Sequence, residues 1–84
     1  NVHNMLGFAY RKAENFDKAF ENYAIALKLN PEHRGVHEYV GQTYLAVGNL
    51  EMANKHLADL DRICFFGCEE YDDLKQAIAA YRPK

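Results

Sequence analysis

Apolar side chains recur along most of the chain at intervals of three and four residues, which is the spacing of one face of an α-helix. The predicted helices cover about residues 2–13, 16–29, 34–47, 50–63 and 69–81. Asn15 and Asn49 stand where a helix would begin, and their side chains can accept hydrogen bonds from free backbone N–H groups. Pro31 and Gly48 stand where helices would end. The pattern therefore predicts an all-α protein.

The apolar pattern repeats itself after 34 residues. The matched positions are Val2-His3 and Val36-His37, Leu6-Gly7 and Val40-Gly41, Tyr10 and Tyr44, Asn15-Phe16 and Asn49-Leu50, Ala19 and Ala53, and Ala24 and Ala58. This period accommodates two short helices and a turn, and such units bury their apolar faces by stacking on neighbours. We expect one unit at residues 1–33, a second at 34–67, and a capping helix with a tail at 68–84.

Two glycines fall inside predicted helices, where glycine costs about 1 kcal/mol relative to alanine. They are Gly7 and Gly41, which occupy matched positions of the repeat. Close approach of a neighbouring helix would explain both. We therefore expect each glycine to lie at a helix–helix contact.

The residues of the first unit resemble the tetratricopeptide repeat. The resemblance is carried by Leu6-Gly7, Tyr10, Asn15-Phe16, Ala19, Tyr23, Ala26 and Pro31. The second unit keeps Gly41, Tyr44, Gly48-Asn49 and Ala53, but has Leu57, Leu60 and Phe65 where the family has an aromatic residue, alanine and proline. His3 and His37 stand where the family often has tryptophan. The departure at the end of the second unit indicates a terminal repeat.

The resemblance implies a right-handed α-solenoid of antiparallel helix pairs that binds other proteins. In that family the first helix of each pair lines a concave groove. The corresponding positions here are Asn4, Phe8, Arg11, Lys12, Glu38, Gln42, Leu45 and Ala46. This mixture favours an amphipathic peptide or helix as the partner, with Phe8 and Leu45 at an apolar centre. Alternatively, Phe8 and Leu45 pack against another repeat.

Composition supports a protein as the partner. The 84 residues carry a formal charge of −2 and no cluster of basic residues, which disfavours binding to nucleic acid. No apolar run reaches the roughly 18 residues of a membrane span. The chain begins with Asn1 inside a helical pattern, so we expect it to be a piece of a longer protein with upstream repeats. A second interpretation is a structural end of such a solenoid that associates with copies of itself through exposed repeat ends.

Cys64 and Cys68 are four residues apart, where the second unit gives way to the last helix. A disulfide is one interpretation, because a turn at a helix end can bring the two Cα atoms close enough. Two buried thiols that act as small apolar residues are another. The third is a redox sensor or metal ligand, because a thiol near a helix N-terminus can have a lowered pKa.

The sequence predicts no catalytic site, no cofactor and no metal site. It has no serine, one threonine and no glycine-rich phosphate loop. His33 and His37 share a predicted helix face beside Glu38, but zinc needs three or four ligands, and neither the cysteines nor His56 complete a recognisable spacing. We expect His37 to pack between helices and His33 to lie in a solvated turn.

Acidic residues gather at the start of the last predicted helix. They are Glu69, Glu70, Asp72 and Asp73. Negative charge at a helix N-terminus interacts favourably with the helix dipole. We expect these residues to stabilise the helix and keep the end of the array soluble; the alternative is a docking patch for a basic partner.

Overall fold

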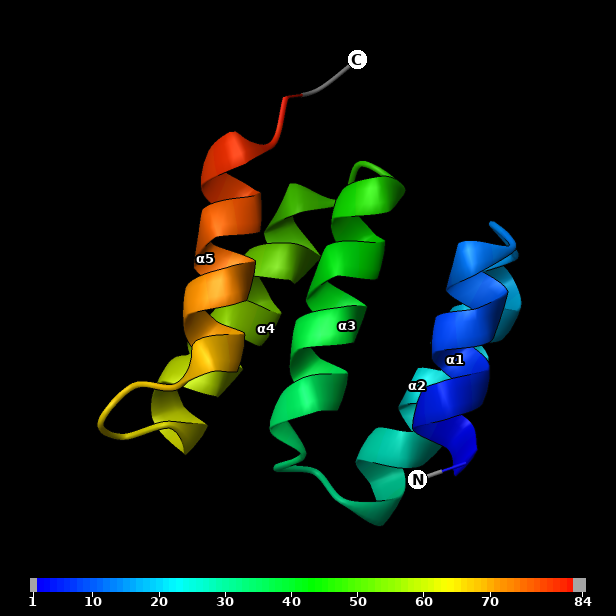
Figure 1. Ribbon diagram of the computed structural model, residues 1–84, viewed down its shortest axis with the longest axis horizontal. Helices are drawn as coiled ribbons and strands as arrows, with labels where there is room; N and C mark the ends of the chain where they lie inside the picture. The colour runs from blue at the N-terminus through cyan, green and yellow to red at the C-terminus, as the bar shows by residue number, and fades with distance from the viewer. Residues whose placement is uncertain (1, 83–84) are drawn as a thin grey trace.

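The computed structural model describes residues 2–82, and the described chain is built from α-helices (Figure 1). The helices are α1 (Val2–Lys12), α2 (Phe16–Leu29), α3 (Arg34–Ala46), α4 (Leu50–Ile63) and α5 (Glu69–Ala80). The all-α prediction is confirmed, and the observed bounds lie close to those expected from the apolar pattern. None of these helices is long and apolar enough to cross a membrane.

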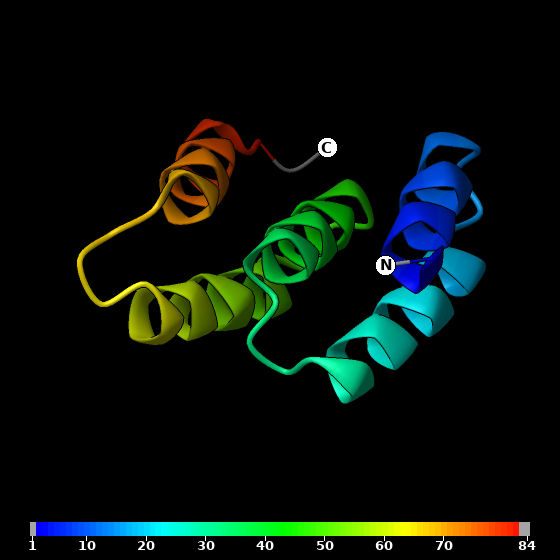
Figure 2. The same ribbon diagram turned by 60° about the horizontal axis from the view of Figure 1, so that its bottom comes forward.

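The helices form two rows. Figure 2 shows α1, α3 and α5 in one row, with α2 and α4 in the other. Each of the first four helices packs mainly against its partner in the pair, α1 on α2 and α3 on α4, while α5 packs on both α3 and α4. The arrangement is flat, with extents of 34 × 30 × 17 Å.

The turns form as the capping residues predict. The side chain of Asn15 accepts a hydrogen bond from the backbone N–H of Lys18, and that of Asn49 accepts one from Met52. Just before these asparagines the backbone turns through the left-handed region, at Glu14 (φ 60°) and Gly48 (φ 80°). Glycine adopts this conformation freely, whereas a glutamate is strained there.

The core consists of two clusters. The first joins both pairs through the buried residues Ala19, Tyr23, Ala26, Val36 and Val40. The second joins α4 to α5 through Leu60, Cys64 and Leu74. Gly7 and Gly41 both lie at helix contacts, as expected: a Cβ on Gly7 would lie 2.6 Å from the Tyr23 ring, and one on Gly41 2.6 Å from Leu74.

Candidate functional site

The residues expected to line a groove lie on two neighbouring helices of one row. Asn4, Phe8, Arg11 and Lys12 lie on α1, and Glu38, Gln42, Leu45 and Ala46 on α3. The ring of Phe8 lies 5.5 Å from that of Tyr39, centroid to centroid, and the Lys12 ammonium group lies 5.4 Å from the Phe8 centroid. Phe8 is nevertheless 37 % exposed. An accessible aromatic surface therefore lies where α1 meets α3.

A pocket of about 230 Å³ opens beside this aromatic surface. Its lining residues are Arg11, Lys12, Glu14, Phe16 and Ala46. Arg11, Lys12 and Ala46 are among the predicted groove positions, whereas Glu14 and Phe16 were not expected to line the groove. The pocket therefore joins the C-terminal ends of α1 and α3 to the turn before α2, with two cationic side chains at its wall.

The α5 end of the same row is acidic. Burial raises the pKa of Glu38, the nearby Asp73 raises it further, a hydrogen bond from Gln42 lowers it, and Glu70 and Glu69 raise it. The Gln42 Nε2 atom donates to Glu38 Oε2 at 2.9 Å. Negative charge therefore accumulates between α3 and α5.

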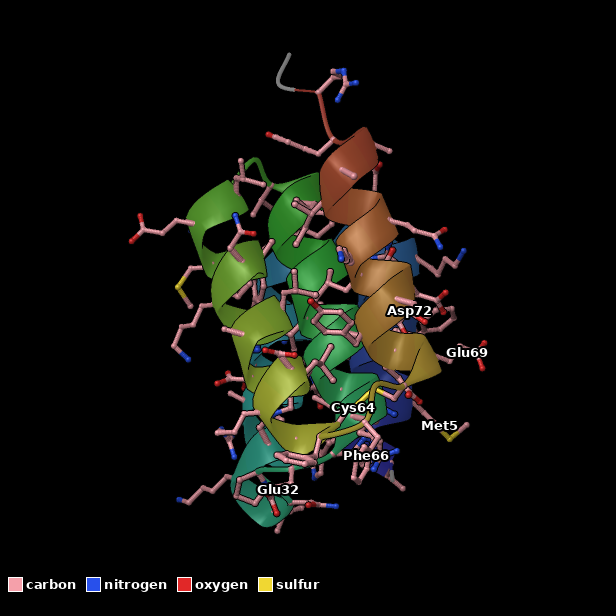
Figure 3. All side chains as sticks on the ribbon, turned by 90° about the vertical axis from the view of Figure 1, so that its left-hand side faces the viewer. Met5, Glu32, Cys64, Phe66, Glu69 and Asp72 are labelled. Atoms are coloured by element: carbon pink, nitrogen blue, oxygen red, sulfur yellow. A yellow bond between two sulfur atoms is a disulfide. The ribbon has the colours of Figure 1, made fainter. Side chains whose placement is uncertain are left out.

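Acidic residues at the start of α5 project to the same side of the molecule as a residue of α1. Figure 3 shows Glu69 and Asp72 of α5 projecting to the same side as Met5 of α1. Glu69, Glu70 and Asp72 occupy the first turn of α5, as expected. We call the surface formed by this row of helices the α1–α3–α5 face.

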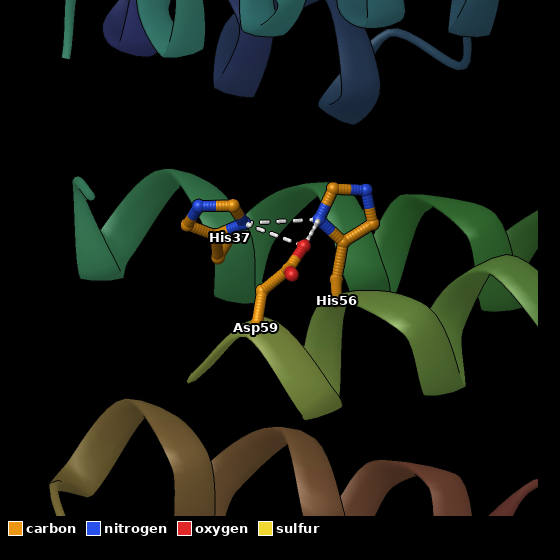
Figure 4. A group of neighbouring side chains, drawn as sticks. All are labelled: His37, His56 and Asp59. Atoms are coloured by element: carbon orange, nitrogen blue, oxygen red, sulfur yellow. Dashed lines mark hydrogen bonds and ion pairs between the residues drawn. The ribbon is translucent and has the colours of Figure 1, made fainter. Parts of the chain in front are cut away.

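A second group of polar side chains lies between α3 and α4. His37 of α3 faces His56 and Asp59 of α4 (Figure 4). The two Nδ1 atoms are 3.0 Å apart, and Asp59 Oδ2 lies 3.8 Å from His37 Nδ1 and 3.9 Å from His56 Nδ1. His37 is 5 % exposed and His56 6 %. The expected packing of His37 between helices is confirmed.

Hydrogen bonds fix the orientation of the His37 ring. Its Nε2 lies 2.7 Å from the carbonyl oxygen of Pro31. A carbonyl can only accept, so this Nε2 carries the hydrogen, and in the neutral ring the Nδ1 keeps a free lone pair. The lone pair points at His56, whose Nδ1 then donates the hydrogen bond that joins the two rings.

His56 is neutral at pH 7. Burial lowers its pKa, the neighbouring His37 and then Lys55 lower it further, and Asp59 raises it, with a result of about 4. Its ring also stacks on Tyr44, with centroids 5.8 Å apart. His56 is therefore accommodated in the interior without a positive charge of its own.

Spacing within one helix does not predict this cluster, because His37 lies on α3 whereas His56 and Asp59 lie on α4. The spacing pairs His37 with His33, but His33 instead begins α3: its Nδ1 accepts a hydrogen bond from the backbone N–H of Val36. The 34-residue repeat does relate the two histidines. His3 contacts Asn22 across the first pair, and adding 34 to both residue numbers gives His37 and His56, which contact each other across the second pair.

A disulfide joins the end of α4 to the start of α5. Its residues are Cys64, the last cap of α4, and Cys68, the first cap of α5, with Cα atoms 5.7 Å apart. The described chain holds no other cysteine. Phe65 and Phe66 in the intervening loop are 84 % and 96 % exposed. A redox-sensing role for the two cysteines stays a prediction.

Comparison with known proteins identifies the first helical pair. The family model of the tetratricopeptide repeat matches residues 1–33, which confirms the resemblance seen in the sequence over those residues. No curated protein and no solved structure matches the chain significantly. Repeats of this family generally mediate contacts between proteins. The match identifies residues 1–33 as a tetratricopeptide repeat, and the five helices arranged in two rows fit a protein built from such repeats.

Proposed function

We propose that the α1–α3–α5 face binds an extended or helical segment of a partner protein. The observation that carries this proposal is the exposed Phe8 ring with the Lys12 ammonium group over it, because Lys12 also lines a pocket together with the cationic Arg11. Peptide grooves commonly place apolar anchors at the centre and charged groups at the rim. Asn4, Gln42 and Leu45 would contact the same segment.

Charge on this face specifies the direction and composition of the bound segment. Arg11 and Lys12 lie at the pocket on α1, whereas Glu38, Glu70 and Asp73 gather between α3 and α5. A complementary segment has an acidic residue near α1, one or two apolar residues at Phe8, and a basic residue near α5. This arrangement favours an amphipathic protein segment over a nucleic acid, whose backbone would meet the acidic end.

We further propose that residues 34–67 form a second repeat and that α5 caps the array. α5 packs on both α3 and α4, which is the position a further helical pair would occupy. Leu74 is fully buried there, whereas Asp72 and Asp73 are exposed. A terminal helix with a polar outer face is what keeps the end of a helical array soluble.

Selection from a random peptide library tests the proposed binding site. Peptides selected on the wild-type chain should combine an apolar residue with charges of both signs. Lys12→Glu should weaken their binding at least about tenfold by reversing a charge at the pocket. Phe8→Glu should abolish binding by removing the apolar anchor.

Lys28→Glu provides the matched control, because it makes the same charge change on the exposed surface of α2, in the other row of helices. Equal binding by Lys12→Glu and the wild type would contradict the proposed site. Sedimentation at several concentrations would reveal the competing interpretation: a dimer disrupted by Phe8→Glu would assign this face to self-association instead.

A further inference from the structure

The three polar atoms between α3 and α4 have the spacing of metal ligands. His37 Nδ1, His56 Nδ1 and Asp59 Oδ2 form a triangle with sides of 3.0, 3.8 and 3.9 Å. The point equidistant from its corners lies about 2.1 Å from each atom, which matches zinc bonds of about 2.0–2.1 Å to nitrogen and 2.0–2.2 Å to oxygen. We propose that His37, His56 and Asp59 form a site for a divalent transition metal such as Zn²⁺.

The surroundings of His37 fit the role of a metal ligand. A ligating histidine usually donates its other ring N–H to a carbonyl or carboxylate, which fixes the tautomer and aims the free nitrogen at the metal. His37 Nε2 makes such a bond to the Pro31 carbonyl oxygen at 2.7 Å. The unprotonated Nδ1 consequently points into the triangle before any metal arrives.

Metal binding replaces the hydrogen bond between the two histidines. In its absence, the hydrogen on His56 Nδ1 bridges to His37 Nδ1. When the metal takes that position, the neutral His56 ring carries its hydrogen on Nε2 and offers Nδ1 as a ligand. Both histidines and the Asp59 carboxylate then contact the metal. The equidistant point lies in the plane of the three atoms, so small side-chain shifts that carry the metal out of this plane open a fourth, tetrahedral position for a water molecule.

The ligand types select among metal ions. Two imidazoles and one carboxylate suit zinc, copper, nickel and cobalt, whereas calcium and magnesium prefer oxygen ligands throughout. Asp59 has 26 % of its side chain exposed, which gives a metal and its water access to the otherwise buried histidines. Lys55 Nζ lies 3.5 Å from the same Asp59 oxygen and is 61 % exposed, so it competes with the metal yet can move away into solvent.

The first helical pair provides an internal comparison. Moving the three positions back by 34 residues gives His3, Asn22 and Ile25. His3 Nδ1 lies 3.3 Å from Asn22 Oδ1, so the backbone brings these positions together in the same way. Ile25 offers no ligand and an amide is a weak one, so the first pair lacks the donor set that the second pair has.

Calorimetric titration of the oxidised full chain with Zn²⁺ tests the proposal, and Co²⁺ absorption reports the coordination geometry. The wild type should bind one Zn²⁺ and raise its melting temperature, and bound Co²⁺ should give the intense visible bands of a tetrahedral site. His56→Asn, which makes the second pair resemble the first, should weaken binding about a hundredfold. Asp59→Asn should weaken it about tenfold.

Two further variants guard against misinterpretation. His3→Gln removes a histidine outside the cluster and should leave Zn²⁺ affinity unchanged. Lys55→Met should raise the affinity, since it removes the competing cation without touching a ligand; this result cannot arise from loss of folding. Absence of Zn²⁺ binding by the folded wild type, or equal affinity in His56→Asn, would overturn the proposal.

Discussion

The first helical pair, α1 and α2, and the second, α3 and α4, share a 34-residue pattern but use matched residues for different contacts. Gly7 admits the ring of Tyr23 within its own pair, whereas Gly41 admits Leu74 of α5. Leu57 takes the matched place of Tyr23 and is only partly buried. The two matched glycines therefore serve different contacts: Gly7 serves packing inside its own pair, and Gly41 serves packing against α5.

The polar contacts of the two pairs differ in a similar way. A half-buried histidine contacts an asparagine in the first pair, and two buried histidines meet in the second. A change of two side chains on one repeated backbone thus converts an ordinary polar contact into a titratable cluster. Repetition preserves geometry, while the chemistry at each position is free to diverge.

Truncating the matched residues Tyr23 and Leu57 should have the largest and most unequal effects. Tyr23 is fully buried in the cluster that joins both pairs, so Tyr23→Ala should lower the free energy of unfolding by about 4 kcal/mol. Leu57→Ala should lower it by about 2 kcal/mol, because the side chain is only partly buried. Urea unfolding followed by circular dichroism measures both, and equal losses would mean that the pairs contribute alike.

The second pair should make stability depend on pH in the metal-free protein. His56 has a pKa of about 4 in the fold and about 6.5 when unfolded, so the unfolded chain binds the proton more tightly. Above pH 6.5 His56 is neutral in both states and the fold keeps its full stability. As pH falls from 6.5 through 4, the proton is taken up by the unfolded chain first, and the free energy of unfolding falls by about 3 kcal/mol. His37, Tyr44, Lys55 and Asp59 are the titratable groups that face it.

The check is urea unfolding at pH 7, 5.5 and 4.5 with a chelator present. His56→Asn gives the second pair the asparagine of the first and should flatten the pH dependence over this range. A profile as steep as that of the wild type would assign the effect to other groups.

The smallest expected effect concerns the turn inside each pair. Glu14 and Gly48 occupy matched left-handed positions, so Glu14→Gly should raise the free energy of unfolding by about 0.5–1 kcal/mol. Gly48→Ala should lower it by about 1 kcal/mol because it introduces a Cβ there. Thermal melts of the two variants should shift in opposite directions; shifts in the same direction would show that side-chain contacts at the turn outweigh the backbone.

Sequence reasoning predicted the helices and turns well because their signals are local. Asn15, Asn49 and Gly48 act through their own backbone neighbourhoods, and the apolar spacing sets the buried faces. The resemblance also located Arg11 and Lys12, which line the pocket. Their role as partner contacts stays a prediction.

The histidine cluster and the α5 contacts escaped prediction because they depend on how helices are placed in space. His37 and His56 are 19 residues apart on antiparallel helices, and no rule of spacing within one helix joins them. The partner of Gly41 likewise depends on where α5 docks. For the cysteines, the sequence left three chemical states open, and the residue spacing alone did not choose among them.

The disulfide between Cys64 and Cys68 changes what a break in the backbone would do. The loop that it encloses presents Phe65 and Phe66 almost entirely to solvent, which suits a protease that cuts after aromatic residues. A cut between them would leave α5 covalently tied to α4 and still seated through the buried Leu74. The nicked protein would remain one covalently linked molecule until reduction of the disulfide released its C-terminal piece. An unbroken backbone is therefore not required for the two parts to stay joined.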